Sequence, residues 1–246
     1  MNSSTQNAGH FSMMKHLQNK IGLLTYPGSP LAYPTVAALQ KRGYKEIYLI
    51  SDGDKPNEKF IKIIDDRTGG KAIFHSMVDF QKMNVPFFFV KDHNSEETLN
   101  LLRNLNLDIL GSCGTPRKLK TIILYACQYG IVNCHPGRLP DYRGSSTVEW
   151  ALLNGDAVAA SAHFMTEEYD AGPVIETYPF STKGLSYAEI RLQMIDHQAQ
   201  SLADGIDRVL RAGKLPSEYA PQPPSQKPLW TVFPEEQMKK MMNRRF

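Results

Sequence analysis

Short apolar runs alternate with helix-length segments through the first half of this 246-residue chain. The runs are rich in β-branched and aromatic residues, and glycine, proline or polar residues bound them. They cover residues 20–26, 46–51, 86–90, 108–112 and 131–133. Helical stretches are expected around 37–39, from residue 94, and over 117–128. This order predicts βαβ units, and hence an α/β chain with a Rossmann-like, mostly parallel sheet covered by helices on both faces.

The pattern changes after residue 133. A loop rich in glycine, proline and arginine covers 135–145, and a helix is expected around 150–153. Two further strands are predicted over 157–165 and 173–180, and one long helix over 186–211. We therefore divide the chain into a flexible N-terminal lead (1–19), a sheet domain (20–212) and a short C-terminal extension (213–246).

Composition excludes several classes of protein. The sequence is 41% apolar and no apolar run is long enough to span a membrane. The net charge of +3 comes from scattered basic residues, which argues against a nucleic-acid partner. The three cysteines form no pattern typical of a metal site or a disulfide framework, and residues 1–20 lack the apolar stretch of a signal peptide. We expect a cytoplasmic protein without a metal.

One segment carries residues suited to chemistry. Asn133 and His135 are two positions apart at the end of a predicted strand, so their side chains project to one side. Asp170 follows 35 residues later (170 − 135) in a predicted loop, with Gly172 supplying backbone freedom. An amide, an imidazole and a carboxylate at a strand end suit transfer of an acyl-type group, because they stabilise an oxyanion and move a proton. From the pattern alone, turn capping explains these residues equally well.

Four ordered motifs resemble the folate-dependent formyltransferase family. They are NCH at 133–135, LPDYRG at 139–144, NGD at 154–156 and DAG at 170–172. The resemblance implies the formyltransferase fold and transfer of a formyl group from N10-formyltetrahydrofolate to an amine. It also implies catalytic roles: Asn133 and His135 stabilise the oxyanion, and Asp170 supports a charged His135 and assists proton transfer.

The same resemblance places the folate pocket. Residues 115–119 resemble the stretch whose backbone groups contact the pterin in this family, with Arg117, Lys118 and Leu119 as the positions concerned. Glu168 and Asp170 are expected to close the opposite wall. The family often has a more apolar residue than Lys118, and a solvated helix start remains an alternative for Arg117 and Lys118. No metal is implied.

Three amine acceptors compete. A methionyl-tRNA acceptor is disfavoured, because we expect no second basic domain after residue 212. A glycinamide ribonucleotide acceptor fits the size of the sheet domain, but two prolines in the 26–30 turn remove N–H donors that would cradle a phosphate. The LPDYRG loop is similar to that of sugar-nucleotide enzymes. We therefore favour an amino sugar linked to a nucleotide, as used in polysaccharide biosynthesis, and assign substrate contacts to Tyr142, Arg143, Gly28 and Ser29.

Further alternatives remain open. Arg143 could instead stiffen its loop, and hydrolysis of formyltetrahydrofolate would replace the amine by water. Cys134 invites a nucleophile interpretation, but strand alternation turns its side chain toward a covering helix. Trp230 and Phe233 either pack internally or contact a base or a second subunit, and a homodimer is expected. The other histidines show no useful clustering along the sequence; they are His10, His16, His75, His93, His163 and His197.

Overall fold

A single seven-stranded sheet organises the molecule. The computed structural model describes residues 16–246. The strands are β1 (Ile21–Thr25), β2 (Ile47–Asp52), β3 (Phe87–Val90), β4 (Ile109–Ser112), β5 (Ile131–His135), β6 (Ala159–Phe164) and β7 (Val174–Pro179). Their order in the sheet is β3-β2-β1-β4-β5-β6-β7. The first five are parallel, and β6 and β7 are antiparallel additions beside β5. The predicted α/β fold with a mostly parallel sheet is confirmed.

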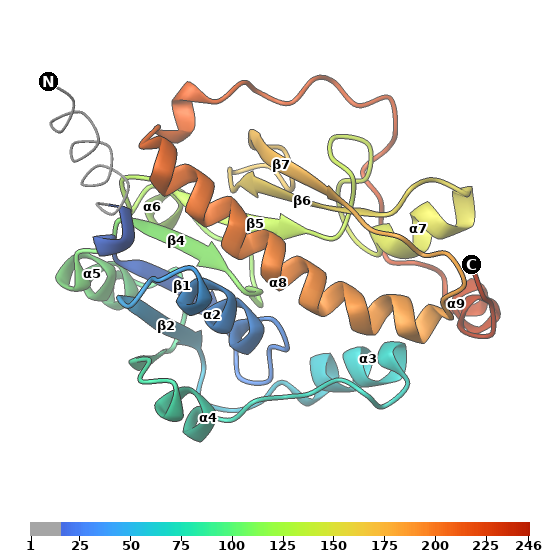
Figure 1. The fold of residues 1–246 in the computed structure, drawn as a ribbon, viewed down its shortest axis with the longest axis horizontal. Coiled ribbons are helices and arrows are strands. Elements are labelled where there is room, and N and C mark those ends of the chain that lie inside the picture. The colour runs from blue at the N-terminus through green and yellow to red at the C-terminus, as the bar shows by residue number, and fades with distance from the viewer. Residues whose placement is uncertain (1–15) are drawn as a thin grey trace, which may run out of the picture.

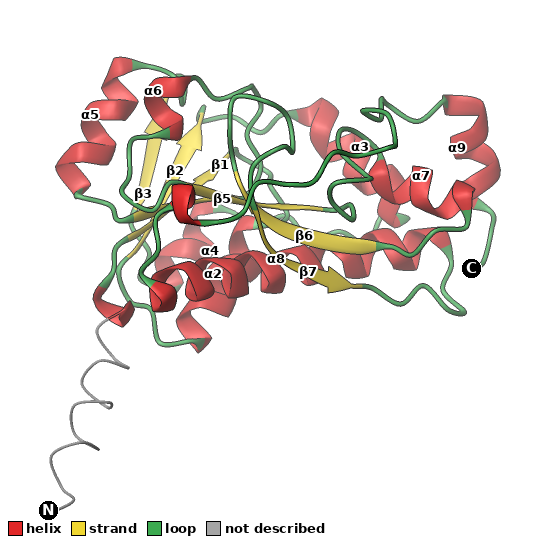
Figure 2. Ribbon diagram, turned by 90° about the horizontal axis from the view of Figure 1, so that it is seen from above, coloured by secondary structure: helices red, strands yellow, loops and turns green. Residues whose placement is uncertain are grey.

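Helices cover both faces of this sheet. They are α2 (Ala32–Lys41), α3 (Glu58–Thr68), α4 (Met77–Lys82), α5 (Glu96–Leu105), α6 (Thr121–Leu124), α7 (Thr147–Asn154), α8 (Tyr187–Ala212) and α9 (Glu235–Met242). Figure 2 shows α2, α4 and α8 on one side of the sheet, with α5 and α6 on the other. Helix α8 crosses the sheet diagonally in Figure 1. Every helix of the described residues is too short or too polar to cross a bilayer.

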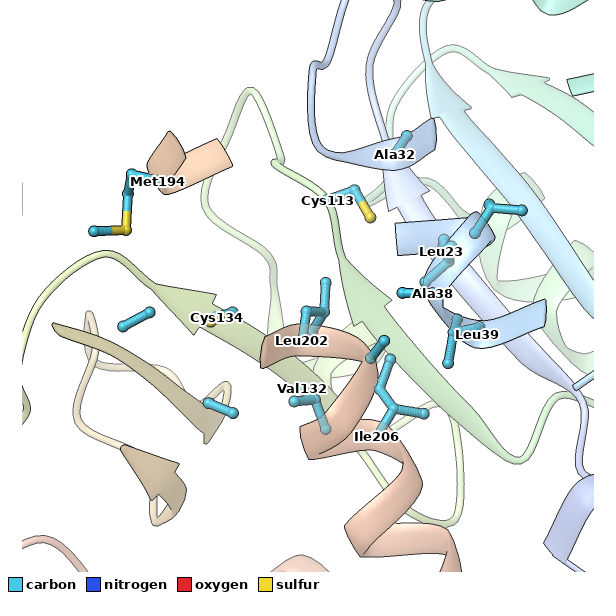
Figure 3. Close-up of a cluster of buried hydrophobic side chains, with 14 of the residues drawn as sticks. Leu23, Ala32, Ala38, Leu39, Cys113, Val132, Cys134, Met194, Leu202 and Ile206 are labelled. Atoms are coloured by element: carbon cyan, nitrogen blue, oxygen red, sulfur yellow. The ribbon is translucent and has the colours of Figure 1, made fainter. Parts of the chain in front are cut away.

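Strand alternation divides the core between the two faces. Val132 and Cys134 of β5 point toward α8, where Met194, Leu202 and Ile206 meet them (Figure 3). On the opposite face, Ile131 belongs to a second buried cluster with residues of α5 and α6. The expectation for Cys134 is confirmed: its thiol is buried in the α8 layer, and burial raises its pKa far above the ordinary range. A nucleophilic role does not fit this environment.

The helix predicted over 117–128 is largely wrong. Only Thr121–Leu124 forms an α-helix. The preceding segment stays irregular because side chains from neighbouring loops hold it: Asn94 accepts from the backbone N–H of Lys120 and donates to the carbonyl of Lys118. These tertiary contacts outweigh the local preference for helix. Helices α3, α4 and α9 were not predicted.

The two ends of the described residues, 16–246, pack against the sheet domain. The 3-10 helix η1 (His16–Gln18) lies within the expected N-terminal lead and has a buried His16; residues 1–15 lie outside the described part. In the C-terminal extension, which includes the 3-10 helix η2 (Pro216–Glu218), Trp230 stacks on Tyr142 and Trp150, and Phe233 is buried against Trp150. Internal packing therefore accounts for both aromatic side chains.

Candidate active site

The end of β5 brings an amide and an imidazole to the carboxyl edge of the sheet. His135 is 5% exposed, its Nε2 lies 2.7 Å from the carbonyl oxygen of Tyr142, and its Nδ1 lies 3.4 Å from Oδ1 of Asp170. Both ring nitrogens therefore face oxygen acceptors, which fixes the orientation of the ring. Gly137 makes this arrangement possible, since a Cβ there would lie 2.7 Å from His135 Nε2 and collide with the Tyr142 carbonyl.

The β6–β7 loop positions Asp170. The residue has a φ of 52°, a left-handed conformation that side chains other than glycine rarely adopt. Two bonds hold it there: the backbone N–H of Gly144 donates to its Oδ2 at 2.8 Å, and Gln222 Nε2 donates to its carbonyl at 2.9 Å. Gly172 is required nearby, because a Cβ at that position would overlap the carbonyl of Phe164. The loop is thus fixed with its carboxylate toward His135.

His163 is a member of the cluster that sequence reasoning missed. Its Nδ1 lies 2.9 Å from the carbonyl of Phe164 and must donate there, so its Nε2 accepts from Asn133 Nδ2 at 3.2 Å. Burial lowers the pKa of His163 to about 4, which keeps the ring neutral. One amide hydrogen of Asn133 is thereby occupied and the other remains to donate. Strand pairing is what identifies His163, since Asn133 and His163 are directly opposite each other in the β5–β6 ladder.

A cavity of about 210 Å³ adjoins this cluster. Asn133, His163 and Asp170 form one wall, and Leu119, Leu124 and Met165 supply apolar surface. All five positions expected to bind the folate line it: Arg117, Lys118, Leu119, Glu168 and Asp170. An apolar floor with a polar rim beside the Asn–His–Asp cluster suits a flat heteroaromatic ring.

Arg117 is neither a free surface cation nor part of a helix start. Its Nε and Nη2 donate to both oxygens of Asp52 at 3.0 and 2.5 Å. Asp52 ends β2, is buried, and also accepts from the backbone N–H of His93. This bidentate pair fixes the 115–119 segment against the sheet. In the sequence, Asp52 is the polar residue after the apolar run 46–51, and nothing there indicates its pairing with Arg117.

Two of the four assigned substrate contacts, Tyr142 and Arg143, do not line the cavity beside the Asn–His–Asp cluster. Tyr142 is 2% exposed, and its hydroxyl pairs with Asp156, Asn154 and Lys227. Arg143 donates from Nε and Nη2 to the carbonyl of Tyr169, at 3.0 and 2.8 Å. Tyr142 therefore anchors the C-terminal extension, and Arg143 stiffens the loop that carries Asp170. The role assigned to Tyr142 as a substrate contact is corrected, and the loop-stiffening alternative for Arg143 is the one that fits.

The other two assigned contacts lie in the turn after β1. Ser29 is buried. Its hydroxyl donates to the carbonyl of Cys113, and its backbone N–H donates to the carbonyl of Tyr26. Gly28 and Ser29 line a separate cavity of about 240 Å³ between β3, α2 and α4. They do not line the cavity beside the Asn–His–Asp cluster. No group of three potential metal ligands occurs within residues 16–246.

Comparison with known proteins supports the resemblance to a family. Residues 61–180 match the formyl transferase family, so the resemblance expected from the motifs is confirmed. The chain is 26% identical over 199 residues to a methionyl-tRNA formyltransferase from Thermotoga maritima; this match covers 78% of the chain but 59% of that relative.

Solved structures share the fold. A glycinamide ribonucleotide transformylase from Symbiobacterium toebii superimposes with a TM-score of 0.61 at 18% identity, covering 80% of this chain and 89% of that one. A likely sugar N-formyltransferase from Mycobacterium tuberculosis gives 0.56 at 15% identity, covering 93% and 82%. The chain therefore has the formyltransferase fold.

Proposed function

We propose, from the premise that residues 61–180 form a formyl transferase domain, that this chain passes a formyl group from N10-formyltetrahydrofolate to a primary amine. One observation carries the proposal. Asn133 and Asp170 line one cavity, and His135 lies between Asp170 and the Tyr142 carbonyl. This places an amide donor, with the His135 ring behind Asp170, beside the position where the formyl oxygen would gain negative charge.

Each polar side chain then has a role in direct attack. The free amide hydrogen of Asn133 and the imidazolium of His135 stabilise the oxyanion that forms when a neutral amine adds to the formyl carbon. Asp170 keeps His135 charged and assists movement of a proton from the new ammonium toward the leaving nitrogen. His163 holds Asn133 in the orientation that leaves one hydrogen free.

The residues that line the 210 Å³ cavity have the chemistry needed to bind the folate ring. Arg117 is fixed by Asp52, so the segment before Leu119 is rigid, and Glu168 and Asp170 lie across the cavity from it. When bound there, the folate supplies the activated formyl group. The residues of the chain bind its ring, exclude water over the apolar floor and orient the formyl carbon toward Asn133 and His135.

For the acceptor we favour an amino sugar linked to a nucleotide. The turn after β1 offers few free N–H groups for a phosphate: Pro27 and Pro30 have none, and the backbone N–H groups of Ser29 and Leu31 bond within the turn. This feature argues against the loop expected for glycinamide ribonucleotide. The chain also spans less than two thirds of the methionyl-tRNA formyltransferase that it resembles.

The test measures tetrahydrofolate release with a panel of amines. The panel contains nucleotide-linked 3-amino and 4-amino sugars, glycinamide ribonucleotide and methionyl-tRNA. Release that requires a nucleotide-linked amino sugar supports the proposal in full. Release with only one of the other amines contradicts the acceptor but keeps formyl transfer, and equal release without any amine indicates a hydrolase. Absence of release with every acceptor and with water contradicts the catalytic proposal.

A further inference from the structure

The C-terminal extension contacts both loops that hold His135. It leaves the end of α8 and continues into α9 (Figure 1). One of the two loops, 139–145, supplies the carbonyl that accepts from His135, and the other, 170–172, carries Asp170. The residues that line the proposed folate cavity all lie within 115–170. The extension therefore affects the site through the two loops and not by lining that cavity.

Gln222 of the extension bridges the turn that carries Asp170. Its Nε2 donates to the carbonyl of Asp170 at 2.9 Å and to the carbonyl of Gly172 at 2.6 Å. The opposite orientation of the amide would place its oxygen against two carbonyl oxygens, so the network fixes which atom is the nitrogen. Oε1 of Gln222 is buried and has no hydrogen-bond partner among residues 16–246. Because a buried unpaired acceptor costs free energy, the side chain serves this turn through its two donors.

The backbone of Asp170 needs such support. Its φ of 52° is left-handed, and a residue with a side chain keeps that conformation only where its surroundings hold it. The N–H of Gly144 holds the carboxylate end of the residue, and Gln222 holds the carbonyl end. Without Gln222 the backbone would be free to relax toward φ below zero. That change would carry the carboxylate away from Nδ1 of His135, which now lies 3.4 Å from it.

The sequence around Gln222 makes the segment stiff. Pro221 and Pro223 flank it, and a residue that precedes proline is restricted to extended backbone. Three residues earlier, Tyr219 packs edge to face on Phe164, with ring centroids 4.9 Å apart. Phe164 ends β6, the strand that leads to the Asp170 turn. Gln222 is thus presented from a restricted backbone that is attached to the same strand as the turn it holds.

A separate attachment holds the other loop. The backbone N–H of Trp230 donates to the carbonyl of Arg143, and the Trp230 carbonyl accepts from the N–H of Ser145, both at 2.9 Å. Gly144 lies between them, where a Cβ would overlap the Trp230 carbonyl. The N–H of Gly144 donates instead to Oδ2 of Asp170 at 2.8 Å. Neighbouring amides of one loop therefore report on different contacts: Ser145 on the extension and Gly144 on Asp170.

We propose that Gln222 is a positioning residue for formyl transfer: it fixes the backbone of Asp170 so that the carboxylate stays against His135. The C-terminal extension is then a functional part of the active site, although it lies outside the folate cavity. The effect on rate rests on the proposed function. The effect on the Asp170 turn is a property of the folded protein and is measured without substrates.

Amide hydrogen exchange, followed by NMR on the full chain, tests the positioning. Gln222→Met keeps the length of the side chain without its donors, and Gln222→Glu replaces Nε2 by an oxygen that both carbonyls repel. In each variant the Gly144 amide should exchange about tenfold faster, as for the loss of one hydrogen bond. The Ser145 amide, bonded to Trp230, should be unchanged. Unchanged exchange at Gly144 overturns the proposal. Equal acceleration at both amides also overturns it, since that result indicates a merely structural role.

Steady-state kinetics of the same variants test the consequence for the reaction. We expect kcat to fall about 10- to 100-fold, as for a displaced catalytic group, while KM for the folate changes less than about twofold. A raised KM with normal kcat overturns the positioning role.

Gln40→Glu is the matched control, because Gln40 is a half-buried glutamine of α2 whose Nε2 donates to the Met83 carbonyl at 2.9 Å. Its kcat should be unchanged, and thermal unfolding checks that all variants are folded. If the unsubstituted protein transfers no formyl group but its Gly144 amide responds to Gln222→Glu as expected, the proposed function fails and the positioning stands. If the enzyme is active but that amide does not respond, the positioning alone fails.

Discussion

Oδ1 of Asp170 lies 3.4 Å from Nδ1 of His135, although the two residues are far apart in the chain. Strand β6 returns antiparallel beside β5, and the loop that follows it carries Asp170 back over the end of β5. His135 Nε2 donates to the Tyr142 carbonyl, so the ring is held from both of its nitrogens. Asn133 lies on the same strand, two residues before His135.

Substitution of either partner should abolish most activity without unfolding the protein. His135→Ala removes the cation, and Asp170→Asn keeps the size of the side chain but removes the charge that supports it. We expect turnover to fall by about 10²–10⁴-fold in each, the usual contribution of positioned acid–base groups. Single-turnover formyl transfer measures this effect, and thermal unfolding serves as the control. Near-normal turnover in either folded variant would contradict the catalytic role of the substituted residue.

Asn133→Ala should lower kcat more than it raises KM. The amide hydrogen not used by His163 is placed to meet the oxyanion, so its loss acts mainly on the transition state. Removal of one such donor costs about 10²–10³-fold in kcat. Steady-state kinetics at saturating folate and amine measure the change. A variant with raised KM and normal kcat would show that Asn133 binds substrate rather than stabilising the oxyanion.

The stability of the protein should decrease with acid because of His163. Its pKa is about 4 in the fold against an ordinary value of 6.5, so between these pH values the unfolded chain binds more protons at this site. The free energy of unfolding therefore falls as the pH drops through this window, by at most about 3 kcal/mol. His163→Gln, which still offers an acceptor to Asn133, should flatten that dependence.

Urea unfolding at pH 8, 6 and 5 measures the effect. The difference between the two proteins at pH 8, where His163 is neutral in both states, reports packing alone and is the reference. If the variant loses as much stability between pH 8 and pH 5 as the unsubstituted protein, another group causes the acid sensitivity.

Asp52→Asn should weaken folate binding with a smaller effect on kcat. The carboxylate holds Arg117 through two bonds, and this pair fixes the wall of the proposed folate pocket but lies away from His135. We expect KM for the folate to rise about tenfold, as for a lost charge-assisted contact. Because Arg117 is 44% exposed, its pair contributes less to stability than to local order. An unchanged KM in a folded variant contradicts this positioning role.

Local patterns were sufficient for the sheet and for part of the site. The end of β5 and the positions of Asn133, His135 and Asp170 could be predicted, because each depends on an apolar run and the polar residues beside it. His163 was missed although it lies in a correctly predicted strand. Its importance depends on the register that sets it opposite Asn133, and register is a property of two strands together.

The alternation of strands and helices in the sequence by itself determined a mostly parallel sheet and the edge at which a ligand site would form. Tertiary structure alone decided which side chains remain available there. Tyr142 is buried by packing, and Arg143 donates to the Tyr169 carbonyl. Arg67 and Arg191 share one buried carboxylate, that of Glu149. Strands and helices form according to residues that are neighbours in the chain. Whether a charged side chain is neutralised depends instead on partners that only the packing of α3, α7 and α8 brings together.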